Sequence, residues 1–168
     1  MSDAARKTIV FEPELCVGCH TCAVACMDQN DLDVERDRLT YRRVVQLERV
    51  DAGAVHIAHL SLSCQHCSDA PCLDACPAGA LARDLASGSV IVREELCIGC
   101  RACAMACPFG VPRFAADGTM RKCDGCYART RFGELPACVE TCPTGALRYE
   151  DANATQARKQ ARRANSLA

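Results

Sequence analysis

The chain has 168 residues, a formal net charge of −1 at pH 7, sixteen cysteines, only 4% aromatic residues and no tryptophan. This length suits one ordinary domain or two very small ones. Because aromatic side chains are so few, we expect bound metal to make up much of the core, and we expect the chain without metal to be unfolded or molten. No apolar run approaches a membrane-spanning length and residues 1–7 lack the apolar core of a secretory signal, so we expect a chain that is soluble by itself.

The cysteines form four groups of four, within residues 16–26, 64–76, 97–107 and 123–142, and none is left over. A disulfide framework is disfavoured, because cysteines in C-x2-C pairs are poorly placed to bond partners elsewhere without strain. Structural zinc is the better alternative, since C-x2-C pairs also build zinc ribbons. Zinc leaves unexplained a third cysteine two residues further on and a fourth followed by proline.

The first cysteine run follows a short predicted strand at residues 9–11. The run, residues 15–26, matches residues 96–107 at eight of twelve positions, and residues 75–81 likewise resemble residues 141–147. We therefore interpret the chain as a duplicated unit of two motifs with a period of about 80 residues. Each motif gives three cysteines to one site and one cysteine to a neighbouring site.

The longest gap between motifs contains two predicted strands, residues 39–50 and 54–62, joined by a turn at residues 51–53. This hairpin either covers the cysteine sites, which is the simpler interpretation, or offers a docking edge to another subunit. His56 and His59 have no ligand spacing to any cysteine pair, so we interpret them as ordinary polar strand residues.

Residues 80–83 and 90–93 flank a turn and are predicted to pair as a β-hairpin. Bacterial ferredoxins join two cysteine runs with such a piece. The second and third motifs are therefore interpreted as one contiguous unit, residues 63–107. By elimination, the first and fourth motifs form the other unit, from residues 1–62 and 108–150.

The third run, Cys97 to Pro108, has the spacing C-x2-C-x2-C-x3-C-P of bacterial-type ferredoxins. In those proteins three thiolates hold one cubane iron–sulfur cluster and the fourth reaches a second cluster. Gly99 lets the backbone pass close to inorganic sulfide. Cys107 lies one helical turn beyond the third cysteine, and Pro108 ends the helix.

Residues 111–119 are predicted to form a loop or short hairpin. The fourth motif is stretched, and the basic residues within it, Arg129 and Arg131, are interpreted as a solvated face in preference to a partner site. Residues 151–168 are rich in Ala, Arg, Lys and Gln, which predicts a frayed helix or a disordered basic tail. The basic side chains of this segment are expected to face solvent: Arg158, Lys159, Arg162 and Arg163.

Residues 8–150 resemble the four-cluster iron–sulfur subunit of the dimethyl sulfoxide reductase family. Three motifs carry the resemblance: Ser63-Cys64-Gln65-His66-Cys67 with Ala70-Pro71-Cys72, then Cys97-Ile98-Gly99-Cys100-Arg101, then Lys122-Cys123-Asp124-Gly125-Cys126-Tyr127. In that family the clusters connect a molybdenum or tungsten bis-pterin catalytic subunit to a membrane quinone-reactive subunit.

The resemblance implies four 4Fe-4S clusters and a ligand set for each. Every ligand position is kept in this chain. The sets are set 1 (Cys16, Cys19, Cys22, Cys142), set 2 (Cys26, Cys123, Cys126, Cys138), set 3 (Cys64, Cys67, Cys72, Cys107) and set 4 (Cys76, Cys97, Cys100, Cys103).

The predicted fold class is α+β, with two bacterial-ferredoxin-like units related by internal duplication, each holding two 4Fe-4S clusters, and with short hairpins, short helices and a basic C-terminal tail. No acid–base pair, nucleophile elbow or nucleotide loop is recognisable, so we expect single-electron relay and no catalysis by this chain alone.

The expected partners are a large molybdopterin catalytic subunit and a membrane anchor, which would hold the chain peripherally at the membrane; no nucleic-acid partner is expected. Similar subunits serve formate dehydrogenase, carbon monoxide dehydrogenase and hydrogenase complexes, so the identity of the catalytic partner stays open. A non-redox zinc protein is the remaining alternative.

Overall fold

Short helices and short strands alternate along the chain in the computed structural model, which describes residues 7–33, 35 and 40–166. This mixture agrees with the predicted class. In chain order the elements are β1 (Lys7–Phe11), η1 (Pro13–Leu15), α1 (Thr21–Gln29), β2 (Arg43–Asp51), β3 (Ala54–Leu62), α3 (Pro71–Asp74), β4 (Leu81–Arg83), β5 (Val90–Val92), η2 (Glu94–Leu96), α4 (Ala102–Ala106), β6 (Arg113–Phe114), β7 (Met120–Arg121), α5 (Tyr127–Thr130), α6 (Ala137–Glu140), β8 (Leu147–Asp151) and α7 (Ala152–Ser166).

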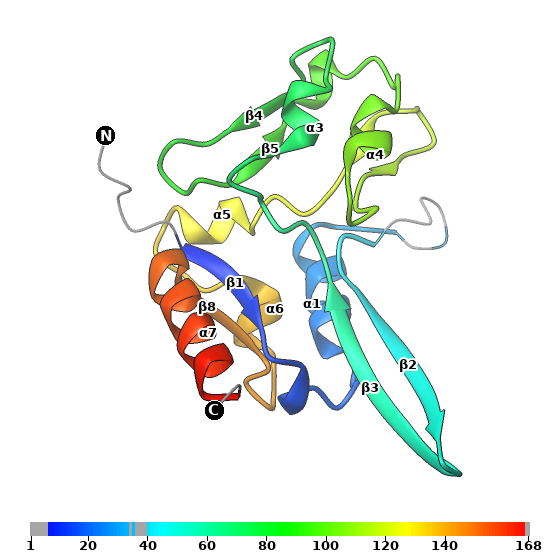
Figure 1. Ribbon diagram of the computed structural model, residues 1–168. Coiled ribbons are helices and arrows are strands. Elements are labelled where there is room, and N and C mark those ends of the chain that lie inside the picture. The colour runs from blue at the N-terminus through cyan, green and yellow to red at the C-terminus, as the bar shows by residue number, and fades with distance from the viewer. Residues whose placement is uncertain (1–6, 34, 36–39, 167–168) are drawn as a thin grey trace.

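The elements gather into two groups, as Figure 1 shows. One group, at the top of the view, contains α3, β4, β5 and α4. The other, at the bottom, contains β1, α1, α6, β8 and α7, and the hairpin of β2 and β3 projects away from both. Within the described ranges the strands pair only into two-stranded antiparallel sheets. No large sheet therefore exists to form the core of the protein.

Strands from the two ends of the described chain meet in one of these sheets. β1 and β8 pair antiparallel, with Phe11 opposite Leu147. Ile9 shares a face with Phe11, and both pack against a core that contains Leu147 and Cys22. The pairing extends the strand predicted at residues 9–11 and brings the fourth motif beside the first.

β4 and β5 form the hairpin that was predicted between the second and third motifs, although each strand is only three residues long. This sheet and the sheet of β1 and β8 are each extended by one further backbone hydrogen bond, and the two bonds are at equivalent positions. The N–H of Arg93 donates to the carbonyl oxygen of Ala80 at 2.7 Å, and the N–H of Glu12 donates to that of Ala146 at 2.9 Å. The corresponding segments thus leave the two sheets in the same way.

The first and third cysteine runs also have matching backbones. Gly18 has a φ of 70° and Gly99 has a φ of 68°. Two residues later His20 and Arg101 have φ values of 62° and 64°, and each run then enters a helix, α1 or α4. Only glycine suits position 99, because a Cβ there would lie 2.8 Å from the carbonyl oxygen of Gly118.

The predicted hairpin between the first two motifs is present as β2 and β3. Ala52 and Gly53 join the strands in a two-residue turn with positive φ at both positions, the geometry of a type I′ turn. β2 begins at Arg43 and not at residue 39, while residues 36–39 lie outside the described part of the chain.

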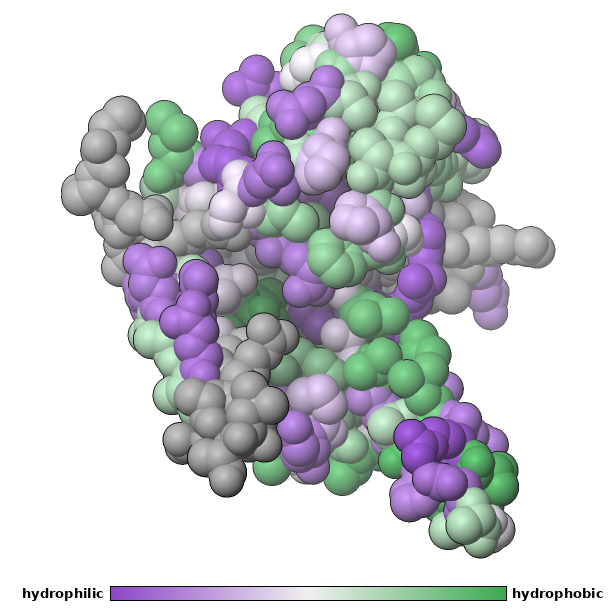
Figure 2. Space-filling model, viewed as in Figure 1, coloured by the Kyte–Doolittle hydropathy of each residue, from purple (hydrophilic) through white to green (hydrophobic). Residues whose placement is uncertain are grey.

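The base of this hairpin packs on the molecule and its far end does not. At the base, Val44 joins the core around Cys22, and the His59 ring occupies the space that a Cβ on Gly18 would need. At the far end, large hydrophobic side chains are exposed, and Figure 2 shows them beside hydrophilic ones. The base therefore acts as a cover, whereas a docking role for the far end stays a prediction. The exposed side chains are Leu47, Val50, Val55 and Ile57.

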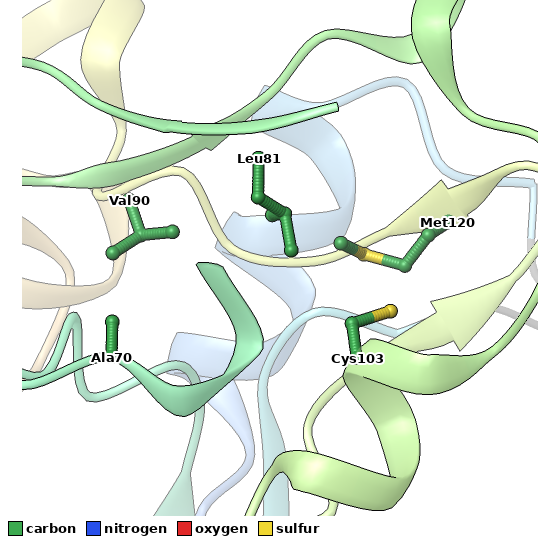
Figure 3. Packing of buried hydrophobic residues seen from close by; sticks show 5 residues of the cluster. All are labelled: Ala70, Leu81, Val90, Cys103 and Met120. Carbon is green, nitrogen blue, oxygen red and sulfur yellow. The ribbon is translucent and has the colours of Figure 1, made fainter. Parts of the chain in front are cut away.

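The largest buried cluster of small and aliphatic side chains lies in the upper group of elements. Figure 3 shows its five members, which come from the segment before α3 and from β4, β5, α4 and β7: Ala70, Leu81, Val90, Cys103 and Met120. Leu81, Met120 and Cys103 point toward one another. A predicted cluster ligand is thus part of the hydrophobic core, which agrees with the small aromatic content.

The C-terminal segment is an ordered helix, α7, packed against β8 and β1. Thr155 on this helix is buried, and the Arg158 guanidinium pairs with Glu12 at 2.8 Å and with Glu150 at 2.9 Å. The expectation that Arg158 merely faces solvent is wrong, because two carboxylates from the sheet of β1 and β8 meet it. The side chains of Lys159, Arg162 and Arg163 lie outside the described part. No described helix is both long and apolar enough to cross a lipid bilayer.

Candidate metal centres

Set 1 surrounds a hollow beneath the base of the hairpin. Its cysteines come from the first run and α1, and from the residue that follows α6 by two positions; they line the hollow together with Phe11, Val44 and Leu147. The Thr21 hydroxyl donates a hydrogen bond to Cys19 Sγ at 3.4 Å, and this bond lowers the pKa of the Cys19 thiol. Hydroxyl and N–H donors therefore already stabilise negative charge on sulfur here.

Set 4 surrounds a corresponding hollow in the upper group of elements. Cys76, Cys97, Cys100 and Cys103 line it together with Leu81, Phe114 and Met120. The Met120 N–H donates to Cys97 Sγ at 3.3 Å. Burial raises the pKa of the Cys103 thiol, and the negative charges of the other three thiolates of the set raise it further.

Set 2 is the most deeply buried, with exposed fractions of 4–8% for its four cysteines. Cys26 lies on α1 and Cys138 on α6, two helices that pack together, whereas the other two cysteines lie in the loop before α5. Burial is the main cause that raises the pKa of Cys26, followed by repulsion from Cys123 and Cys138. Burial likewise raises the pKa of Cys126 to about 11. The Gly125 N–H donates to Cys123 Sγ at 3.4 Å.

Set 3 lies where α3 packs against α4. Cys72 is on α3, and Cys107 caps the end of α4. Burial raises the pKa of the Cys72 thiol, with a further contribution from the negative charge of Cys107. The His66 N–H donates to Cys64 Sγ at 3.4 Å. Each predicted set thus corresponds to thiols that lie in one neighbourhood, while their ligation of a cluster stays a prediction.

The ligand number and geometry of the thiols bear on the kind of metal group that they could hold. Among the described residues, which include all sixteen cysteines, no three Cys, His, Asp or Glu side chains converge closely enough to hold a single metal ion. Structural zinc needs four ligands at about 2.0–2.3 Å from one centre. The four thiols that line each of the hollows at sets 1 and 4 match in number the four cysteine ligands of a 4Fe-4S cluster.

Two buried cations lie beside the cysteine sets, and the sequence did not predict the burial of either one. The Arg42 side chain is 2% exposed and donates to the Ser61 and Ser63 hydroxyls at 2.9 and 2.7 Å. Lys122 is 5% exposed, and its Nζ donates to the carbonyl oxygens of Cys123 and Val90. Only the position of Lys122 next to a motif cysteine could have pointed to it, and nothing local distinguishes Arg42 from its exposed neighbour in the chain.

These cations change the acidity of the nearest thiols. Burial raises the pKa of the Cys138 thiol, but the positive charge of Arg42 acts in the opposite direction. Lys122 likewise opposes the effect of burial on the pKa of Cys64 and of Cys72. Each cation therefore favours the thiolate forms that ligate iron.

The stretched part of the fourth motif is held together internally. Arg129 pairs with Glu140 at 2.5 Å and with Glu134 at 3.3 Å, and it donates to the Leu135 carbonyl oxygen at 2.8 Å. The guanidinium of Arg131 lies 4.7 Å from the centre of the Phe132 ring. The prediction that Arg129 belongs to a solvated face is wrong, because its charge fixes the loop before α6.

Comparison with known proteins agrees with this picture. Residues 55–152 match a family model described as a 4Fe-4S dicluster domain, and residues 13–28 match one described as a 4Fe-4S binding domain. The chain is 44% identical over 149 residues to the B subunit of the anaerobic dimethyl sulfoxide reductase of Haemophilus influenzae, covering 83% of this chain and 71% of that relative.

Two relatives from Escherichia coli are similar to the same degree. The chain is 43% identical to the B subunit of that organism's anaerobic dimethyl sulfoxide reductase over 143 residues, which cover 80% of this chain and 68% of the relative. It is 44% identical to protein NrfC over 151 residues, which cover 88% of this chain and 66% of the relative. The predicted family is therefore confirmed. This chain belongs to the 4Fe-4S dicluster family and, within it, to the electron-transferring iron–sulfur chains of the dimethyl sulfoxide reductase family.

Proposed function

We propose that this chain relays single electrons through four 4Fe-4S clusters held by sets 1 to 4. The observation that carries the proposal is the gathering of all sixteen cysteines into four neighbourhoods, each built from two motifs. When bound, such a cluster takes up or gives off one electron at a potential set by nearby charge, hydrogen bonds to sulfur and solvent exposure. The N–H and hydroxyl donors beside the thiols supply such hydrogen bonds.

We infer that the neighbourhoods follow one another in a row. The negative charge of Cys22 in set 1 raises the pKa of Cys138 in set 2. The negative charge of Cys64 in set 3 likewise raises the pKa of Cys123 in set 2. Sets 3 and 4 share the packed pair α3 and α4. The order is therefore 1, 2, 3, 4, which leaves sets 1 and 4 at the ends. One cysteine is exposed in each of these end sets, Cys19 in set 1 and Cys100 in set 4. An exposed ligand at each end would let electrons enter and leave the row.

We infer that the two halves of the chain arose by duplication. Residues 1–62 and 108–150 would make one ferredoxin-like unit around residues 63–107, the second unit, with residues 151–168 as a tail. The matching φ values of the two cysteine runs support this inference. So do the equivalent hydrogen bonds that continue the sheet of β1 and β8 and the sheet of β4 and β5.

The proposed partners are a molybdenum or tungsten bis-pterin catalytic subunit at one end of the row and a quinone-reactive membrane subunit, or another redox partner, at the other. Support comes from the relatives named as B subunits of anaerobic dimethyl sulfoxide reductases. Protein NrfC, under a different name, is equally similar at 44% identity. Similarity alone therefore does not select the substrate of the complex.

The test compares the chain alone with the chain joined to the large subunit that co-purifies from the native host. Each sample receives reduced viologen and an oxidised substrate, in turn a sulfoxide, an N-oxide, thiosulfate and nitrate. We expect no turnover by the isolated chain and viologen-dependent turnover once the large subunit is present. Turnover by the isolated chain, at a rate unaffected by the partner, would show that a cluster here is itself catalytic.

A further inference from the structure

Arg42 is a buried cation whose neighbours are hydroxyls and thiols. It donates to Ser61 and Ser63, and the Ser61 hydroxyl in turn lies 3.5 Å from Cys22 Sγ of set 1. Its positive charge also acts on Cys138 and Cys26 of set 2. None of the ion pairs within the described residues involves Arg42. Its guanidinium lies near thiols of both set 1 and set 2, and no carboxylate of the described residues forms an ion pair with it.

Lys122 occupies the corresponding place between set 2 and set 3. Its Nζ bonds the carbonyl oxygen of Cys123, a member of set 2, and its charge acts on Cys64 and Cys72 of set 3. Lys122 is likewise absent from the ion pairs of the described residues. Its other bond, to the Val90 carbonyl oxygen, fixes the ammonium group against the core of the upper group.

No buried lysine or arginine of the described residues lies beside set 4. Among residues whose side chains the structure describes, Arg42 and Lys122 are the only buried lysine or arginine. Arg101, which lines the hollow of set 4, is exposed and lies over the Phe114 ring at 5.1 Å. Within the part of the chain that the structure describes, the buried positive charge thus lies beside the first three sets and is concentrated around set 2.

Burying a cation without a counter-charge is costly. The negative charge of thiolates and of the clusters that they would hold can balance both cations, which explains their positions. Reduction adds one electron to such a site, and a fixed positive charge in a low-dielectric surrounding favours the added negative charge. A cation that lies between two sites also reduces the repulsion between electrons that occupy both.

We propose that Arg42 and Lys122 set the potentials of this relay, Arg42 by raising the reduction potential at set 2 and secondarily at set 1, and Lys122 by raising it at set 3 and set 2. Both are positioning residues, since they act on the clusters through space and through the ligand shell. Both cations act on set 2, so we expect the site at set 2 to be reduced most readily. This proposal rests on the proposed function, because it requires clusters at these sets.

The experiment uses the full chain purified anaerobically, with an EPR-monitored redox titration of each variant. Arg42→Gln and Lys122→Gln remove the charges, whereas Arg42→Lys and Lys122→Arg keep them. Arg43→Gln is the matched control, because Arg43 is the next residue and is exposed. The signals of set 2 and set 3 are identified by their loss from Cys138→Ser and Cys107→Ser. Iron and acid-labile sulfide are measured on every sample.

We expect Arg42→Gln to lower the potential at set 2 by at least a tenfold change in its one-electron reduction equilibrium, about 59 mV. Lys122→Gln should lower the potentials at set 3 and set 2, while set 4 and the Arg43→Gln control stay unchanged. Arg42→Lys and Lys122→Arg should recover most of each shift.

Wild-type potentials in iron-replete Arg42→Gln and Lys122→Gln would overturn the proposal. It would also be overturned if the glutamine variants lost clusters that the charge-preserving variants keep, since the cations would then serve assembly and not potential. A wild-type chain that holds no iron–sulfur clusters would instead refute the proposed function, so the two failures are distinguishable.

Discussion

Gly99 shows how little room the cysteine runs leave for a side chain. Its φ of 68° lies in the left-handed region, and the carbonyl oxygen of Gly118 occupies the space of a Cβ. Gly79 has a similar φ of 61°, but nothing lies within 4 Å of the Cβ position there. The two glycines therefore share a backbone requirement and differ in the space around them.

This difference predicts unequal effects of alanine. Gly79→Ala should cost about 1–2 kcal/mol from the left-handed conformation and keep its cluster. Gly99→Ala adds a clash with backbone that cannot move aside, so we expect loss of the cluster at set 4 and about twelve irons per chain in place of sixteen. Iron analysis of the two anaerobically purified variants checks this. Equal iron contents would mean that the loop of Gly99 adjusts.

The sequence was sufficient to recognise the residues that carry their signal locally. Cysteine spacing predicts the runs, because a turn with three thiolates has the same local requirements in every ferredoxin. Lys122 belongs to a recognised motif, but its burial could not be read from it, and Arg42 could not be recognised at all. Arg42 and Arg43 are adjacent and chemically identical, yet only the first is buried, and that difference depends on residues that pack from β3 and α6.

The hairpin of β2 and β3 combines a packed base with an exposed end. Val44 and Val50 lie on the same face of β2, six residues apart. Val44 packs into the core around Cys22, whereas Val50 is 71% exposed. Hydrophobic burial therefore fixes only the part of the hairpin that covers set 1.

Introducing a charge at each position separates the two parts. Val44→Asp should destabilise the holo-protein by about 2–3 kcal/mol, since it places a carboxylate in the core, and Val50→Asp should change stability by less than about 0.5 kcal/mol. The temperature at which cluster absorbance is lost, measured anaerobically, reports both. A loss at Val50 as large as that at Val44 would mean that the far end also stabilises the isolated chain.

The helix α7 depends on ion pairs that join distant parts of the sequence. Arg158 reaches Glu12, 146 residues earlier, as well as Glu150. A polar composition predicts fraying because helix propensity alone is weak. The partners of Arg158 could not be found from the composition of residues 151–168, since Glu150 and Glu12 both lie outside that segment and Glu12 is far away in the sequence.

Arg158→Gln should release this helix. Amide hydrogen exchange in α7 is expected to become faster, because the side chain that bonds both Glu12 and Glu150 is lost. Arg148→Gln is the control, since Arg148 is 47% exposed and its contact with Glu150 is long at 3.8 Å. If exchange in α7 is the same in both variants and the wild type, packing and not the ion pairs holds the helix.

The nested arrangement of the motifs decides which cysteines share a site. α1 and α6 pack together, as do α3 and α4, so the first motif lies with the fourth and the second with the third. The sequence repeat predicts this nesting, because the middle motifs resemble a contiguous ferredoxin. The buried lysine and arginine between successive sets could not be predicted, since they depend on how the two groups of elements meet.

Nested pairing has a direct consequence for cysteine variants. Cys138→Ser should disturb only the cluster at set 2, which Cys26 helps to hold from far away in the sequence, and leave the two clusters at sets 3 and 4. Cys107→Ser should spare set 2 and disturb set 3. EPR spectra of the two reduced variants distinguish the outcomes. Loss of a cluster at set 3 or 4 from Cys138→Ser would mean that the motifs pair in sequence order.

The content of iron, acid-labile sulfide and zinc in the anaerobically purified chain tests the four-cluster relay most directly. We predict a brown protein with about sixteen irons and about sixteen sulfides per chain, and EPR signals of several interacting clusters after reduction with dithionite. A folded, colourless protein that holds zinc in place of iron would contradict it.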